Sequence, residues 1–116
     1  MNPASVSQVL GELNGSPRYL GTLAVTTTGQ ASNFSNAPRF GPGAQLLVQA
    51  DAACLVLGGT SGVADITTVN GVALQAGQTF YIRLRSPKFA VGLAGETHIQ
   101  AVTAAGTANL KVWMME

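Results

Sequence analysis

The sequence contains very little charge. Asp, Glu, Lys and Arg together make up 9 % of its 116 residues, against roughly 25 % in an ordinary soluble domain. The net charge is only +1, so no general field attracts the chain to nucleic acid or to an anionic membrane. Three classes of protein can be this poor in charge: membrane proteins, secreted sandwiches, and subunits whose surfaces are covered by partners.

Long apolar runs are also absent. Segments such as 52–57 are far shorter than the roughly 20 residues that a transmembrane helix needs. A membrane barrel needs about eight strands of 9–11 residues, and this chain is too short and too rich in turns for that. The first residues contain neither a basic segment nor an apolar core, so we expect no secretory signal. We therefore expect no membrane partner and favour an assembled subunit.

Residues for metal binding or catalysis are scarce. The single histidine, His98, and the single cysteine, Cys54, cannot form a zinc cluster, and the scattered acids do not resemble a calcium loop. His98 and Glu96 could join a serine in nucleophilic catalysis, and any pair among Asp51, Asp65 and Glu96 could serve in glycoside hydrolysis, but no nucleophile-elbow or other local motif supports either chemistry. We expect no enzyme, metal, cofactor or small-molecule substrate, a buried inert Cys54, and an exposed His98.

Fourteen glycines and five prolines punctuate short β-rich runs, a pattern typical of a sandwich or barrel. The clearest strand is 79–85, in which apolar and polar positions alternate strictly. Its two faces are Phe80, Ile82 and Leu84 on one side and Tyr81, Arg83 and Arg85 on the other. Further strands are expected at 19–27, 45–50, 53–57, 67–74, 89–93, 97–103 and 109–114.

These runs predict an all-β, single-domain β-sandwich of jelly-roll type, with about eight to ten short strands over residues 17–116. Residues 1–16 are expected to form an N-terminal arm or a short helical turn. Segment 29–43 has no steady period, so we expect a long ordered loop or an edge extension. The glycine-containing segment 75–78 is expected to close a hairpin between 67–74 and 79–85.

Smaller features give further expectations. In 97–103, Ile99 and Ala101 are expected on one face, and His98 and Gln100 on the other. The run 58–62, Gly-Gly-Thr-Ser-Gly, is expected to be a loop and not a phosphate site, because no Gly-Lys-Ser/Thr motif or helix follows it.

One cluster of positive charge is formed by Arg83, Arg85 and Lys88. The two arginines would stand about 7 Å apart on one face of a strand. They could form a solvated face with a cross-strand acid such as Glu96, or they could contact an acidic patch on a neighbouring subunit. Nucleic acid is disfavoured as a partner because no aromatic stripe accompanies the charges.

Some aromatic residues fall outside the core pattern. Trp113 shares a strand face with Lys111, and Phe34 and Phe40 lie in the irregular segment. We expect each ring to pack on its own domain, yet aromatic residues and arginine are also enriched at interfaces. The candidate interface residues are therefore Arg83, Arg85, Lys88, Arg39, Phe40, Phe34 and Trp113.

Segment 46–59, LLVQADAACLVLGG, is followed by 72–84, VALQAGQTFYIRL, and then by a Thr/Ala-rich strand pair. This succession, over residues 44–115, resembles small virion proteins of tailed bacteriophages, namely capsid decoration (cement) proteins and related β-sandwich accessory subunits. The resemblance implies a structural protein, often a homotrimer, made in the host cytoplasm and placed on the outer surface of the capsid. Its partners would be the major capsid protein and sister subunits, and it would clamp the shell against internal DNA pressure.

A second hypothesis is a receptor- or carbohydrate-binding module of a phage tail or fibre protein. That role predicts exposed aromatic side chains, such as Trp113, Tyr81 or Phe40, along a groove.

Overall fold

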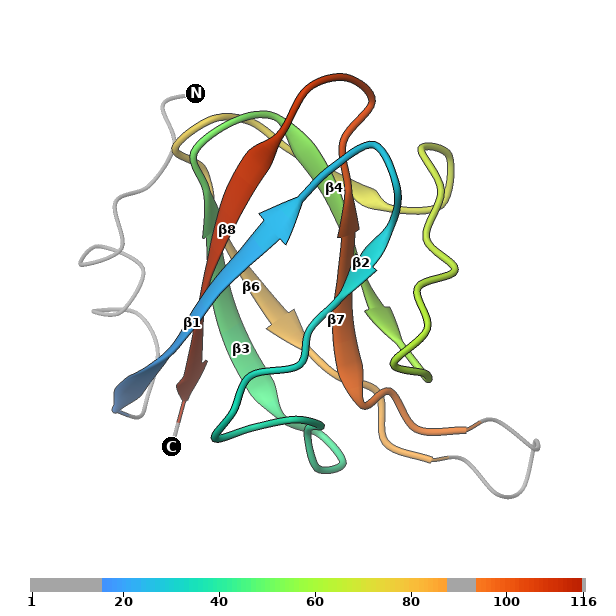
Figure 1. The fold of residues 1–116 in the computed structure, drawn as a ribbon. Helices are drawn as coiled ribbons and strands as arrows, with labels where there is room; N and C mark the ends of the chain where they lie inside the picture. The colour runs from blue at the N-terminus through green and yellow to red at the C-terminus, as the bar shows by residue number, and fades with distance from the viewer. Residues whose placement is uncertain (1–15, 88–93, 116) are drawn as a thin grey trace.

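The computed structural model describes residues 16–87 and 94–115. Within these residues, eight strands form two antiparallel sheets of four strands each (Figure 1). Sheet A has the order β1-β8-β3-β6 and sheet B the order β2-β7-β4-β5. The strands are β1 (Pro17–Val25), β2 (Gln30–Ala31), β3 (Gln45–Ala50), β4 (Cys54–Gly59), β5 (Val72–Leu74), β6 (Thr79–Arg83), β7 (His98–Val102) and β8 (Ala108–Met115). The predicted all-β sandwich is confirmed.

The strand pairing is nested. β1 pairs with β8, β2 with β7, β3 with β6 and β4 with β5, as in one long antiparallel hairpin. Rolling this hairpin up brings β3 against β8 and β4 against β7, which completes the two sheets. This topology is the jelly roll, as predicted.

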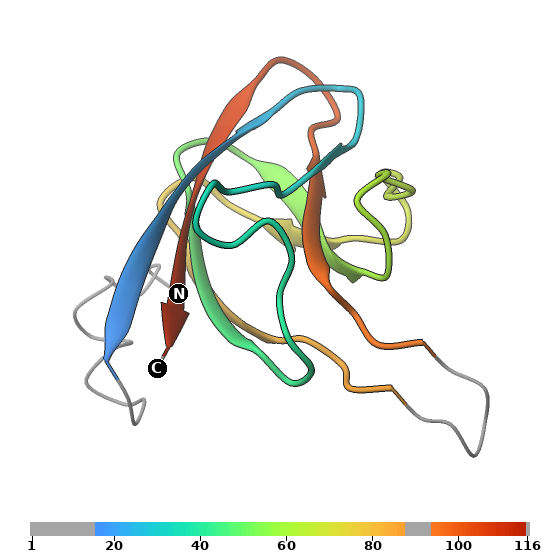
Figure 2. The ribbon, with the colours of Figure 1, turned by 60° about the horizontal axis from the view of Figure 1, so that its bottom comes forward.

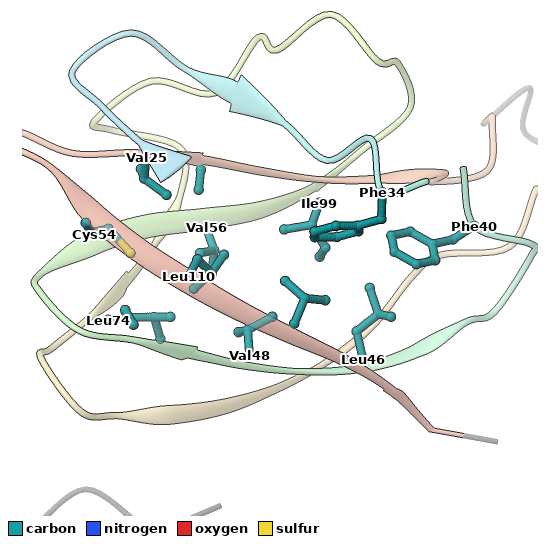
Figure 3. Close-up of a cluster of buried hydrophobic side chains, with 14 of the residues drawn as sticks. Val25, Phe34, Phe40, Leu46, Val48, Cys54, Val56, Leu74, Ile99 and Leu110 are labelled. Carbon is teal, nitrogen blue, oxygen red and sulfur yellow. The ribbon is translucent and has the colours of Figure 1, made fainter. Parts of the chain in front are cut away.

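The core lies between the sheets, where the inward positions of the strands meet (Figure 3). β3 contributes Leu46 and Val48, and both are fully buried. Burying such a side chain typically stabilises the fold by about 1.5–3 kcal/mol relative to leaving it exposed. Cys54 is also buried in the core, as predicted, and burial, aided by the nearby Asp51 carboxylate, raises the pKa of its thiol.

The predicted hairpin between 67–74 and 79–85 is wrong. β5 pairs with β4 in sheet B, whereas β6 pairs with β3 in sheet A. The segment between them passes from one sheet to the other, with Gly77 in the left-handed region (φ 78°) and its N–H donating to the carbonyl of Ala50 (2.7 Å). A glycine turn marks a reversal of the chain, but it does not specify whether the next strand stays in the same sheet.

The irregular segment 29–43 combines an edge strand with an ordered loop, as expected. β2 pairs with β7, and Phe34 then forms a bridge with Ala37. The Phe34 ring lies against Gly21, where a Cβ would come within 2.9 Å of it. The run 58–62 differs from expectation, because Gly58 and Gly59 belong to β4. The predicted strand 89–93 and almost all of the predicted arm 1–16 lie outside the described residues.

The edges of sheet B offer little backbone for pairing with another chain, and the edges of sheet A, which include the nine-residue β1, carry other features that oppose it. In sheet B the edge strands are β2, with two residues, and β5, with three. In sheet A, β1 begins with Pro17 and is interrupted by a bulge between Tyr19 and Gly21, and β6 ends in the exposed Arg83. Short strands, prolines, bulges and charges at edges all oppose edge-to-edge association. Among the described strands, pairing at an edge is thus opposed most strongly in sheet B.

Candidate functional site

Segments 84–87, after β6, and 94–97, before β7, form the described part of an arm at one end of the sandwich. Segments 84–87 and 94–97 run side by side beyond the sheets (Figure 2), and the Glu96 N–H donates to the Arg85 carbonyl (2.8 Å). Between this arm and segment 39–42 lies a pocket of about 460 Å³. We name it the arm pocket; it is lined by 39–42, Thr60, Pro87 and 94–97.

Backbone hydrogen bonds fix the walls of the arm pocket. The Phe40 N–H donates to the Thr97 carbonyl, and the Thr97 N–H donates to the Gly59 carbonyl, each at 2.8 Å. These bonds join the irregular loop, β4 and the segment leading into β7. The pocket is therefore built before any ligand arrives, which lowers the entropic cost of binding.

The contact between the basic cluster and Glu96 is made by a backbone amide of the cluster. The Arg85 N–H donates to Glu96 Oε1 at 2.6 Å, and the Arg85 guanidinium donates through Nη2 to the Ala94 carbonyl at 3.3 Å. Glu96 therefore lies beside Arg85, as expected for a cross-strand acid, although the contact to its carboxylate is made by the backbone amide of Arg85. Arg83 and Arg85 are both exposed, and Lys88 lies outside the described residues.

His98 is half-buried, not exposed as predicted. Its Nδ1 lies 2.7 Å from the Thr97 hydroxyl, and a Cβ added at Gly62 would approach its other ring nitrogen at 3.3 Å. Burial and the positive charge of Arg39 lower the pKa of His98, against a smaller opposite effect of the Pro38 backbone. Alternation within a strand could not reveal that other segments lie over this position.

Gln100, also predicted on the outer face, is fully buried there. Its Oε1 accepts the Asp65 N–H (3.1 Å), and its Nε2 donates to the carbonyls of Ser61 (3.2 Å) and Val63 (3.4 Å). The amide thereby fixes the loop after β4 to the outside of sheet B. A Cβ on Gly59 would collide with the Gln100 side chain. The two successive glycines at the end of this strand were therefore the available signal that a side chain packs closely against the backbone there.

The outer face of sheet A carries an apolar row. The strand register aligns Tyr19, Trp113, Leu47 and Tyr81 across β1, β8, β3 and β6; we name these four residues the aromatic row. The rings of Tyr19 and Trp113 have centroids 5.6 Å apart and are tilted by 59°, a favourable aromatic arrangement. Tyr19 is 50 % exposed, whereas Leu47 is fully buried although it points away from the core.

Trp113 lies on the outer face, as predicted. Tyr19 and Leu47 also belong to the aromatic row, and the sequence pattern did not predict their positions in it. Phe34 and Phe40 instead lie in the core (Figure 3). Both rings pack on their own domain, so they are not available to anchor a partner. Arg39, the neighbour of Phe40, is exposed at the arm pocket.

A second pocket, of about 490 Å³, includes Gln49, Asp51, Asn109 and Lys111 in its lining. The Asp51 carboxylate accepts the backbone N–H of Asn109 (2.7 Å) and its side-chain Nδ2–H (2.9 Å). These two hydrogen bonds lower the pKa of Asp51. Through these hydrogen bonds, Asp51 connects the end of β3 to the start of β8.

Residues 16–87 and 94–115 contain no group of three metal-ligating side chains. The same residues contain no helix that could cross a membrane. No protein-family model, no curated protein and no solved structure matches the chain.

Proposed function

We propose that this protein is a structural subunit of a virion, a decoration protein that binds the outside of a phage capsid and stabilises it through contacts with the shell and with sister subunits. The observation that supports this role best is a charge-poor jelly roll with an apolar row on one outer face. Jelly rolls recur in viral capsid proteins, although they also occur in lectins.

The aromatic row has the residue types of a contact surface. Tyrosine and tryptophan are enriched among the residues that dominate binding energy, and Tyr19 and Trp113 are both at least partly exposed here. Because the sheet edges are short, bulged or charged, contact through the face of sheet A is the simpler mode of assembly.

The end of the sandwich that carries the arm pocket supplies the polar part of the proposed contact surface. Arg39, Arg83 and Arg85 are exposed, and the carboxylate of Glu96 is already engaged by a backbone N–H. An excess of positive charge suits an acidic patch on a neighbouring protein and would speed association and fix its orientation.

The direct test is the native mass of the purified protein at high concentration, combined with binding to expanded phage heads. We expect a homotrimer, or saturable binding to heads, that is weakened by Trp113→Ala and Tyr19→Ala. Val63→Ser is a matched control, because Val63 is exposed but lies outside the aromatic row. If the protein stays monomeric at high concentration and does not bind phage heads, the proposal is ruled out.

The alternative role, a carbohydrate-binding module, is favoured by the aromatic row, in which Tyr19, Trp113 and Tyr81 are each at least partly exposed. Phe40 does not contribute, because it is buried and cannot line a groove. Glycan-array binding that is lost on Trp113→Ala, in a variant that still folds, would favour this alternative over the decoration role.

A further inference from the structure

We propose that the arm pocket receives an acidic segment of a neighbouring protein, with a carboxylate of that segment bound by Arg39 and an apolar side chain seated against Pro42 and Pro87. This inference rests on the proposed function, which provides such a neighbour. It assigns the contact to a specific place and to a specific chemistry.

The size and construction of the arm pocket suit this occupant. Its volume of about 460 Å³ is within the roughly 300–1,000 Å³ of sites that bind small ligands, so one or two side chains of a partner can enter it. The hydrogen bonds Phe40 N–H to Thr97 O and Thr97 N–H to Gly59 O hold the walls in place. A rigid wall does not have to be ordered when the partner binds.

The charges around the arm pocket favour an anion. Arg39 is exposed and lines the pocket, and a guanidinium can bind a carboxylate with two parallel hydrogen bonds. Glu96 is the acid of the lining, and its Oε1 accepts the Arg85 N–H. Arg85 itself reaches the Ala94 carbonyl, so a second cation lies beside the pocket and offsets the charge of Glu96.

The remaining lining distinguishes a peptide from a sugar. Pro42, Pro87 and Ala94 offer an apolar surface, and the hydroxyls of Thr60 and Thr97 add two polar groups. The ring of Phe40 is buried in the core, so the lining residues that the structure describes present no aromatic face on which a sugar ring could stack. An acidic side chain next to an apolar one fits this lining better than a saccharide does.

The test uses the whole chain and two capped dipeptides, acetyl-Glu-Leu-amide and acetyl-Gln-Leu-amide, titrated into ¹⁵N-labelled protein. We expect the Glu probe to shift the amide signals of Thr60, Gly95 and Thr97, with at least fivefold tighter binding than the Gln probe. Arg39→Gln should reduce binding of the Glu probe to the level of the Gln probe. Lys111→Gln, which removes an exposed cation elsewhere on the surface, should leave binding unchanged.

Several results would overturn the proposal. They are equal shifts with both probes, undiminished binding to Arg39→Gln, shifts confined to residues near Lys111, and stronger shifts of the same amides by methyl glucoside. Arg39→Lys, which keeps the charge, should retain part of the preference for Glu, and it checks that loss in Arg39→Gln is not a folding defect. Binding to phage heads tests the proposed function separately, so either idea can fail without the other.

Discussion

The outer faces of the two sheets differ in how their outward side chains are covered. On sheet B, the loop after β4 lies over the face, is bonded to the buried Gln100, and buries Ile66. On sheet A, the outward positions form the aromatic row, in which Tyr19 is half exposed. One face is thus covered by a nearby loop of the same chain, whereas the row on the other face ranges from the half-exposed Tyr19 to the fully buried Leu47. We therefore look for assembly on sheet A and for internal stability on sheet B.

The largest expected effect is a loss of stability of similar size on both sides of β3. Leu46 faces the core and Leu47 faces outward, yet both are fully buried. Leu46→Ala and Leu47→Ala should each lower the free energy of unfolding by about 2–5 kcal/mol, measured by urea denaturation. A loss below about 1 kcal/mol for Leu47→Ala alone, as is usual for exposed sites, would show that its position is open in solution.

A smaller effect is expected on sheet B. Gln100→Ala leaves the Asp65 N–H and the Ser61 and Val63 carbonyls without their partner, which should cost about 1–3 kcal/mol. The loop should also become more sensitive to limited proteolysis. Gln75→Ala, at an exposed position, is the control and should change neither property. Unchanged proteolysis of Gln100→Ala would mean that the loop does not depend on this amide.

The smallest expected effect is the pH dependence contributed by His98. Its folded-state pKa is lowered from 6.5, chiefly by burial, so the unfolded chain takes up the proton first as the pH falls. The contribution of His98 is therefore complete above about pH 6.5 and is lost as the pH falls through the lowered value. His98→Gln should flatten the stability curve between pH 7.5 and 5, followed by denaturant midpoints. An equally steep curve in the variant would assign the slope to other groups.

Local pattern was enough to predict the fold class and several strands. The bounds of β3 agree with the predicted 45–50, because its alternation and flanking turn are both encoded within a few residues. The pairing of β5 was predicted wrongly, because a glycine turn that crosses between sheets has the same sequence features as one that closes a hairpin.

The candidate site was predictable only in part. Trp113 and the exposed arginines followed from strand alternation, whereas Phe40 turned inward and Arg39 outward within one irregular loop. Gln100 and Leu47 were missed because the burial of an outward position depends on what lies over it. Tyr19 was missed because the bulge after it changes the register of β1.

The position of β8 between β1 and β3 has a consequence for synthesis on the ribosome. Until β8 has emerged, β1 has no neighbour in sheet A, and β3 has only β6. A nascent chain can therefore close sheet B, whose strands all precede β8, but it cannot join the two halves of sheet A. The face that carries the aromatic row is assembled only once β8 has emerged, so a nascent chain without β8 cannot present it.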